Sequence, residues 1–95
     1  MSFPHGSGVD ELDAIKADLA LVDTWLAEPI LLFVASGEWQ EPVPDVERAF
    51  QQIRRAITSA TTTYPTMRIH LDEYSRYLLN LEKVYLAIHH HLRIS

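Results

Sequence analysis

The sequence predicts an all-α fold: a small helical bundle of three long helices plus one short helix, assembled as a dimer. Three observations support this prediction. Apolar residues recur at alternating steps of three and four along most of the chain, as on one face of an α-helix. No segment alternates with period two for more than a few residues, so strands are not expected. Prolines also separate the periodic segments.

The longest helix is predicted over residues 67–92, which contain no proline or glycine. At about 1.5 Å per residue, it would span roughly 39 Å. Its apolar stripe consists of Met67, Leu71, Tyr74, Leu78, Leu81, Tyr85, Ile88 and Leu92. Further apolar residues flank this stripe, namely Tyr77, Leu79, Val84 and Leu86. A helix that buries one stripe does not need them, so we expect a second surface, most simply from a two-fold homodimer. The alternative is that the protein's own helices cover all of these residues.

A first helix is predicted from Val9 or Asp10, with acidic residues in its first turn, where they favour a helix N-terminus. Its stripe consists of Leu12, Ile15, Leu19, Val22 and Leu26, widened by Leu21 and Trp25. Pro29 removes a backbone donor and clashes with the preceding turn, so it either kinks this helix or begins a new short one. Gly37 is expected to close the segment.

A loop is predicted over residues 38–44, because two prolines lie two residues apart there. The middle helix then begins at Pro44 or Asp45 and ends before Pro65, and Thr66 can cap the helix that follows. Its stripe consists of Val46, Phe50, Ile53, Ile57, Ala60 and Tyr64.

The length and composition predict a single helical domain over residues 9–95, preceded by a flexible N-terminus over residues 1–8. The chain has no cysteine, which excludes disulfides and fits a cytoplasmic protein. The first ten residues lack the pattern of a secretory signal. The longest strongly apolar run, residues 30–35, is too short to cross a bilayer, so no membrane partner is expected.

The charge is distributed unevenly. Residues 1–45 contain one lysine and nine acidic residues, a balance of −8, whereas residues 46–95 contain seven basic and four acidic residues, a balance of +3. Such halves suit helices that attract each other within a chain or across a dimer, although scatter on a solvated surface is an equal alternative. Because no excess of Lys and Arg is present, a nucleic-acid partner is not expected.

The sequence indicates no catalytic residues, no metal ligands and no cofactor. His89, His90 and His91 are consecutive and fan out around a helix, whereas a pair of helical metal ligands needs a spacing of three or four. We interpret them as polar residues near a helix C-terminus. Glu-x-x-His pairs and phosphate-binding glycine loops are both absent.

Several residues are candidates for contacts with a protein partner. Trp39 is flanked by acids and prolines in the predicted loop, and its alternative role is to cover the end of the core. Tyrosines 74, 77 and 85 could form a recognition stripe, although at helical spacing they are more often part of the core. The predicted partner-binding residues are Trp39, Tyr77, Leu79, Val84 and Leu86.

Two segments, residues 15–23 and 42–48, resemble the first helix and the loop-to-second-helix junction of the small, all-helical, dimeric chorismate mutases. The resemblance implies a pocket for a small anionic ligand, with Lys16 and Arg48 as its cations. The second arginine of the family's first helix has no counterpart, because its place falls in the apolar residues 29–34. This departure favours a non-catalytic relative over an enzyme.

The sequence therefore predicts a small protein–protein interaction module that acts through helix-on-helix contacts, as an accessory, adaptor, chaperone-like or inhibitor protein. Its partner would be another protein, a second copy of itself, or both. The alternative is a chorismate-mutase-like enzyme, or its non-catalytic relative, that binds a small anion through Lys16 and Arg48.

Overall fold

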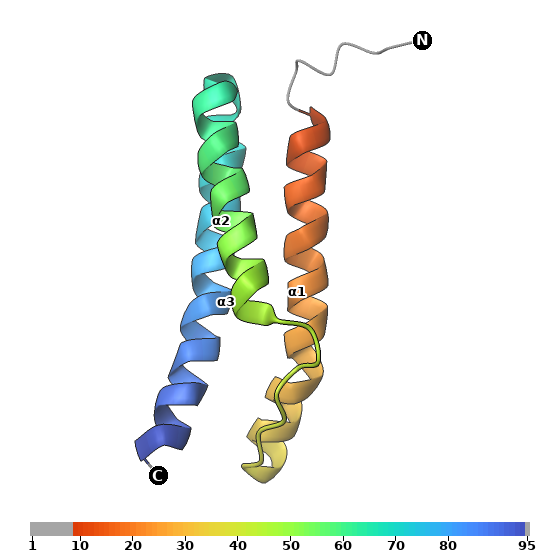
Figure 1. The fold of residues 1–95 in the computed structure, drawn as a ribbon, viewed down its shortest axis with the longest axis vertical. Helices are drawn as coiled ribbons and strands as arrows, with labels where there is room; N and C mark the ends of the chain where they lie inside the picture. Colours follow the sequence, from red (N-terminus) through yellow and green to blue (C-terminus); the bar gives the residue numbers. More distant parts are fainter. Residues whose placement is uncertain (1–8, 95) are drawn as a thin grey trace.

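A computed structural model describes residues 9–94, and over this range the all-α prediction is confirmed. Helix α1 covers Val9–Ser36, α2 covers Val46–Thr63, and α3 covers Arg68–Ile94. A short 3-10 turn, η2 (Pro65–Met67), joins α2 to α3. The helices run down, up and down along one long axis, and α2 lies in front of α3 (Figure 1). The flexible terminus predicted for residues 1–8 lies outside the described residues.

The short fourth helix predicted after Pro29 is not a separate element. Helix α1 continues through Pro29 to Ser36, so the bundle has three long helices in its described part. Pro29 and Trp25, four residues before it, both line an open groove. Leu26, before Pro29, is fully buried, and Ile30, after it, is half-buried, so packing holds both sides of the proline in one helix. Gly37 ends α1 with φ of 77°, as predicted, and its N–H donates to the carbonyl of Phe33.

Helix α2 has the cleanest amphipathic pattern of the three. The Asp45 side chain caps its N-terminus by accepting a hydrogen bond from the Arg48 N–H at 3.0 Å. The predicted stripe is buried except for its last member, Tyr64, which is half-buried. Thr66 lies within η2 rather than capping α3, because Pro65 at the first position already turns the chain into a short helix.

The core follows the three predicted stripes. From α1 and α2 it contains Ile15, Leu19, Val22, Leu26, Val46, Phe50, Ile53, Ile57 and Ala60. From α3 it contains Leu71, Leu78, Tyr85 and Ile88, whereas Leu92 is exposed.

The two ends of the bundle differ in how many helices they contain. At the end that holds the start of α1, all three helices pack together, and we call this the closed end (Figure 1). Beyond the start of α2, the molecule consists of residues 27–36 of α1, the loop 37–45 and residues 89–94 of α3, and we call these residues the open end. No residue from Ala27 to Ser36 is buried.

Candidate functional site

The loop that follows α1 is held by a cluster of aromatic rings at the open end. The Trp39 ring contacts Phe33, Tyr85 and His89 edge-on, with ring centroids 6.3, 6.1 and 5.8 Å apart. The rings of Tyr85 and His89 lie 4.3 Å apart, and Phe50 of α2 packs edge-on against Tyr85. Because edge-to-face pairs are favourable beyond the area they bury, the cluster links the loop to α1, α2 and α3.

The Glu41 carboxylate is the polar centre of this cluster. Its Oε1 accepts a hydrogen bond from Trp39 Nε1 at 2.7 Å, and its Oε2 accepts one from the Tyr85 hydroxyl at 3.1 Å. His89 Nε2 lies 2.6 Å from Oε1, close enough for an ion pair when the ring is protonated, although the angle is not that of a hydrogen bond. One carboxylate therefore contacts three side chains of the cluster.

Tyr85 is a hydrogen-bond donor here rather than a reactive group. Burial raises the pKa of its phenol, and the hydrogen bond to the Glu41 carboxylate raises it further. A neutral phenol at physiological pH neither attacks a substrate nor accepts a proton readily. The cluster therefore anchors the loop.

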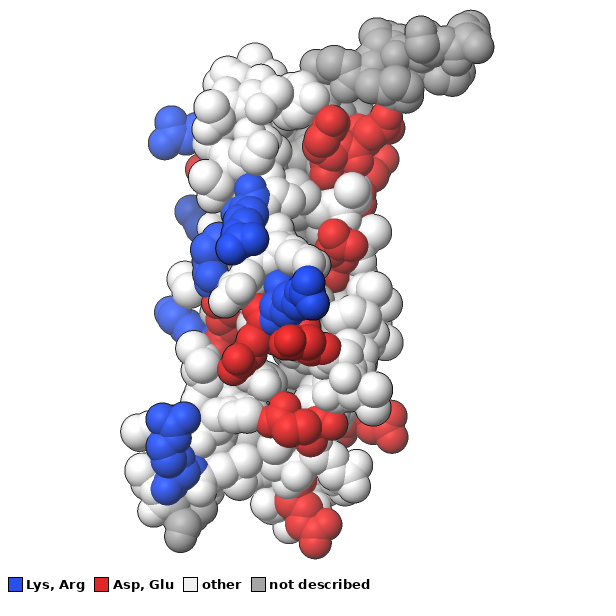
Figure 2. Space-filling view, viewed as in Figure 1, with Lys and Arg blue, Asp and Glu red and all other residues white. Residues whose placement is uncertain are grey.

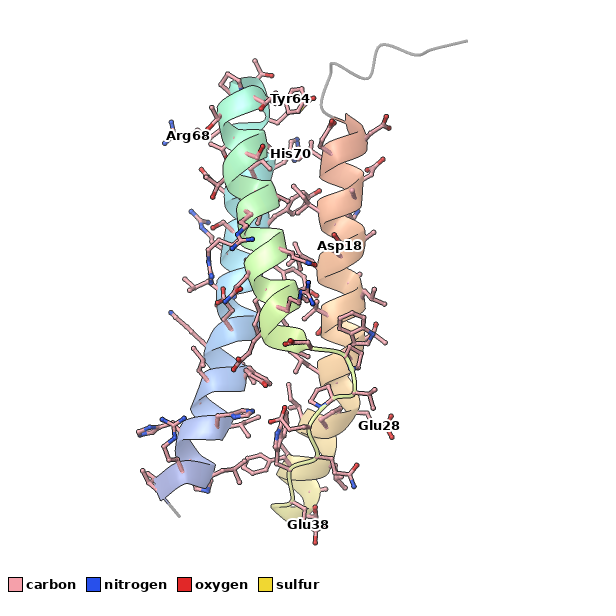
Figure 3. All side chains as sticks on the ribbon, viewed as in Figure 1. Asp18, Glu28, Glu38, Tyr64, Arg68 and His70 are labelled. Carbon is pink, nitrogen blue, oxygen red and sulfur yellow. The ribbon has the colours of Figure 1, made fainter. Side chains whose placement is uncertain are left out.

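Two more tyrosines bind carboxylates of α1 in the same way. The Tyr64 hydroxyl, at the end of α2, donates to Glu11 at 3.1 Å, and the Tyr77 hydroxyl on α3 donates to Asp23 at 2.8 Å. In both cases the hydrogen bond is the largest cause of a raised phenol pKa. Figure 3 labels Tyr64 at the closed end, on the side of α2 that faces α1.

The acidic and basic halves lie on different sides of the molecule. Figure 2 shows Asp and Glu over α1 and the loop, with a further acidic area near the centre, and Lys and Arg mainly over α2 and α3. The Arg54–Glu82 ion pair joins two residues of the second half. The three phenol–carboxylate bonds, by contrast, join acids of the first half to the second half. Phenol donors thus link the acidic first half to the second half in these three contacts.

The structure separates the predicted partner-binding residues into three places. Trp39 is half-buried in the aromatic cluster. Tyr77 and Val84 lie seven positions apart on the edge of α3 that faces α1, since Tyr77 reaches Asp23. Leu79 and Leu86 lie on the opposite edge, where each lines a groove together with Arg54 of α2. All four α3 residues are exposed, but they do not form one patch.

Lys16 and Arg48, the proposed cations of an anion site, are not brought together. Lys16 lies in the closed-end half of α1, whereas Arg48 lies in the first turn of α2, next to the open end. Both side chains are exposed, and neither lines a groove that we identified. The groove beside the Lys16 turn is lined instead by Glu11 and Asp18, which do not suit an anion.

Glu41, Tyr85 and His89 were not predicted to form a group. Tyr85 and His89 are four residues apart on one helix, a spacing that places both on one face, and Trp39 and Glu41 are separated by a single residue. Each pair is visible in the sequence. Nothing in the sequence shows that the two pairs meet.

Other kinds of site have less support. Within residues 9–94, no group of three or more His, Cys, Asp or Glu side chains is arranged to hold a metal ion. The helix Asp10–Ser36 is long and apolar enough to cross a membrane, a property that core helices of soluble proteins and signal sequences share. The apolar run 30–35 was judged too short to cross a bilayer on its own, but α1 continues through Pro29, so this run is part of a longer apolar helix.

Comparison of the chain with models of known protein families, with curated proteins and with solved structures gave no match.

Proposed function

We propose that the protein is a non-catalytic protein–protein interaction module of the cytoplasm that acts through helix-on-helix contacts and forms a homodimer. The observation that supports this proposal is the composition of α1 at the open end. Between Ala27 and Ser36, only Glu28 and Ser36 are polar, yet no residue of the segment is buried. A helix that is apolar on all sides is normally covered on all sides.

The exposed side chains at the open end are large. Leu31 is 69% exposed, Val34 is 77% exposed, and Val43 in the loop is fully exposed. Leu92 and Ile94, near the end of α3, add to the exposed apolar residues at this end. Soluble proteins rarely leave several large apolar residues exposed together unless they serve an interface.

A protein partner fits this helix better than a lipid bilayer. Asp23 and Glu28 lie within its apolar part, and an acidic side chain in the centre of a membrane helix costs about 3 kcal/mol. At an interface between proteins, both carboxylates can meet donors or remain at the rim. The two acidic residues therefore favour a protein partner over a lipid bilayer.

Size-exclusion chromatography with light scattering tests the proposal. The wild type is expected to be a dimer, and Val34→Glu is expected to convert it to a folded monomer, because a charge would be buried in the interface. Leu79→Glu and Leu86→Glu test the two-sided α3 surface in the same way. Gln52→Glu, on the exposed side of α2, is the control with the same new charge. A wild type that remains monomeric at all concentrations would contradict self-association.

A further inference from the structure

A groove of about 650 Å³ runs between the second half of α1 and the loop at the open end. Its walls are mainly apolar. From α1 they include Trp25, Pro29, Leu31 and Leu32, and from the loop they include Pro42, Val43 and Pro44. This volume and this lining are those of a site that accepts several apolar side chains.

The loop wall of the groove is held in place before any partner arrives. Pro42 and Pro44 restrict the backbone because each proline fixes its own φ angle. Glu41 lies immediately before them and is fixed by Trp39 and Tyr85. A preformed wall lowers the entropy cost of binding.

The charged residues that line the groove have one sign. Glu28 and Glu41 line it, and no Lys or Arg occurs anywhere in residues 17–45. Figure 3 shows Glu28 on α1 pointing away from the bundle, beside the loop. An apolar partner without a cation would desolvate both carboxylates: Glu41 would keep only its hydrogen bonds from Trp39 and Tyr85 and the nearby His89, and Glu28 would gain no partner at all.

We propose that this groove docks an amphipathic helix of another protein, with an apolar face flanked by Lys or Arg. The apolar face would fill the space beside Trp25 and Leu31, and the cations would pair with Glu28 and Glu41. A second copy fits less well, because the groove of one copy against that of another would bring together carboxylates only. This inference rests on the proposed function and specifies the chemistry of its partner.

Trp25 provides a direct readout, because the chain has two tryptophans and only Trp25 lines the groove. The difference between the fluorescence of the unmodified protein and that of a Trp25→Phe variant isolates the Trp25 signal and leaves the hydrogen bond between Trp39 and Glu41 intact. We expect this signal to shift to the blue, saturably and at one-to-one stoichiometry, on titration with an amphipathic peptide of about 15 residues made of leucine and lysine. The same peptide with glutamate in place of lysine is expected to cause no shift. Calorimetry on the unmodified protein with both peptides repeats the comparison without any substitution.

Two variants of α1 separate docking from general attraction to an acidic protein. Glu28→Lys, in the groove, should weaken binding of the lysine peptide about tenfold or more. Asp13→Lys makes the same change of charge on an exposed turn of α1 outside the groove and should alter binding by less than about twofold. Equal weakening by both variants, or equal binding of the glutamate peptide, would overturn the proposal.

Other occupants of the groove give different results. A blue shift with neutral phosphatidylcholine vesicles instead of the peptide would indicate a lipid surface and overturn the proposal. Because the proposed dimer also uses the open end, the Trp25 signal is first recorded against protein concentration without peptide. If the lysine peptide then causes no further shift in the dimer, a second copy occupies the groove and the proposal is overturned. Light scattering on the same samples distinguishes the two proposals. If the protein is a dimer and does not bind the peptide, only the groove proposal is contradicted. If the protein is a monomer and binds the peptide, only the proposed self-association is contradicted.

Discussion

The closed end and the open end of this bundle share α1 and α3, but only the closed end also contains α2. At the closed end, α1 presents one apolar stripe to α2 and α3, and Ile15, Leu19 and Val22 are buried there. At the open end, α2 is absent, and α1 is apolar around its circumference with no buried residue beyond Leu26. The first part of α1 therefore meets the needs of folding, whereas the second part also carries large apolar side chains, such as Leu31 and Val34, that the monomer leaves exposed.

Two leucines of α1 give the strongest test of this difference. Leu26 is completely buried, so Leu26→Ala should lower the free energy of unfolding by about 2–5 kcal/mol, through lost burial and a new cavity. Leu31 is mostly exposed, so Leu31→Ala should change the free energy of unfolding by less than about 0.5 kcal/mol. Urea unfolding of both variants measures these values at concentrations where the protein is monomeric. Similar losses for the two leucines would show that the open end contributes to the core.

Pro29 lies at the boundary between the two ends, and its replacement should stabilise the fold. Pro29→Ala restores a backbone donor inside a continuous helix and should raise the free energy of unfolding by about 1–3 kcal/mol. Pro44→Ala, in the loop, is the matched control and should have the opposite effect. It should lower stability by up to about 1 kcal/mol, because the unfolded chain without this proline has a higher conformational entropy. Thermal unfolding followed by circular dichroism compares the two. If Pro29→Ala lowered the stability instead, the packing of the proline ring would contribute more to stability than the missing backbone hydrogen bond costs.

Tyr85 connects the two ends, and its phenol should make stability depend on alkaline pH. Tyr85→Phe removes the hydrogen bond to Glu41 and should cost about 1 kcal/mol at neutral pH. The pKa of Tyr85 is raised above its ordinary value of 10.0, so the folded state favours the neutral phenol. Its contribution is fully present below about pH 10 and is lost as the pH rises further.

Denaturant unfolding at about pH 8 and about pH 11 measures this effect. Wild type should lose more stability between the two values than Tyr85→Phe, which retains Tyr64 and Tyr77 as an internal reference. Equal losses in the two proteins would show that the Tyr85 phenol does not anchor the loop.

The smallest expected effect concerns the start of α2, where the open end gives way to the closed end. Asp45→Ala removes the side chain that accepts the Arg48 N–H and should cost about 0.5–1 kcal/mol. Asp45→Asn keeps an acceptor and should retain most of this stability. Chemical denaturation resolves the difference if the two variants are measured side by side. An Asn variant as unstable as the Ala variant would indicate that the negative charge matters, not the cap.

The sequence predicted those features that depend on local pattern. The buried stripe of α2 from Val46 to Ala60 agrees with the prediction, because a period near 3.6 fixes one face of a helix. The end of α1 at Gly37 agrees for a similar reason, since a glycine tolerates the positive φ found there. Such features need only a few neighbouring residues.

Features that depend on distant contacts were predicted less well. Pro29 was expected either to kink the first helix or to begin a short new one, and the predicted fold included the short helix. Packing of Leu26 and Ile30 on either side keeps α1 continuous. Trp39 was identified as a candidate, whereas Glu41 and His89 were not, because their importance arises only where the loop meets α3. Periodicity describes each helix but not which turns of two helices lie side by side.

The phenol–carboxylate bonds have a consequence for how the assembly of this protein can be followed. Their partners are 53, 54 and 44 residues apart in the chain, so none of them can form within an isolated helix. Closing chains of this length costs more entropy than one such bond returns, so each bond exists only in the assembled bundle. Tyrosine ultraviolet absorbance is therefore an optical marker of tertiary assembly, independent of helix content, and needs no added dye or label.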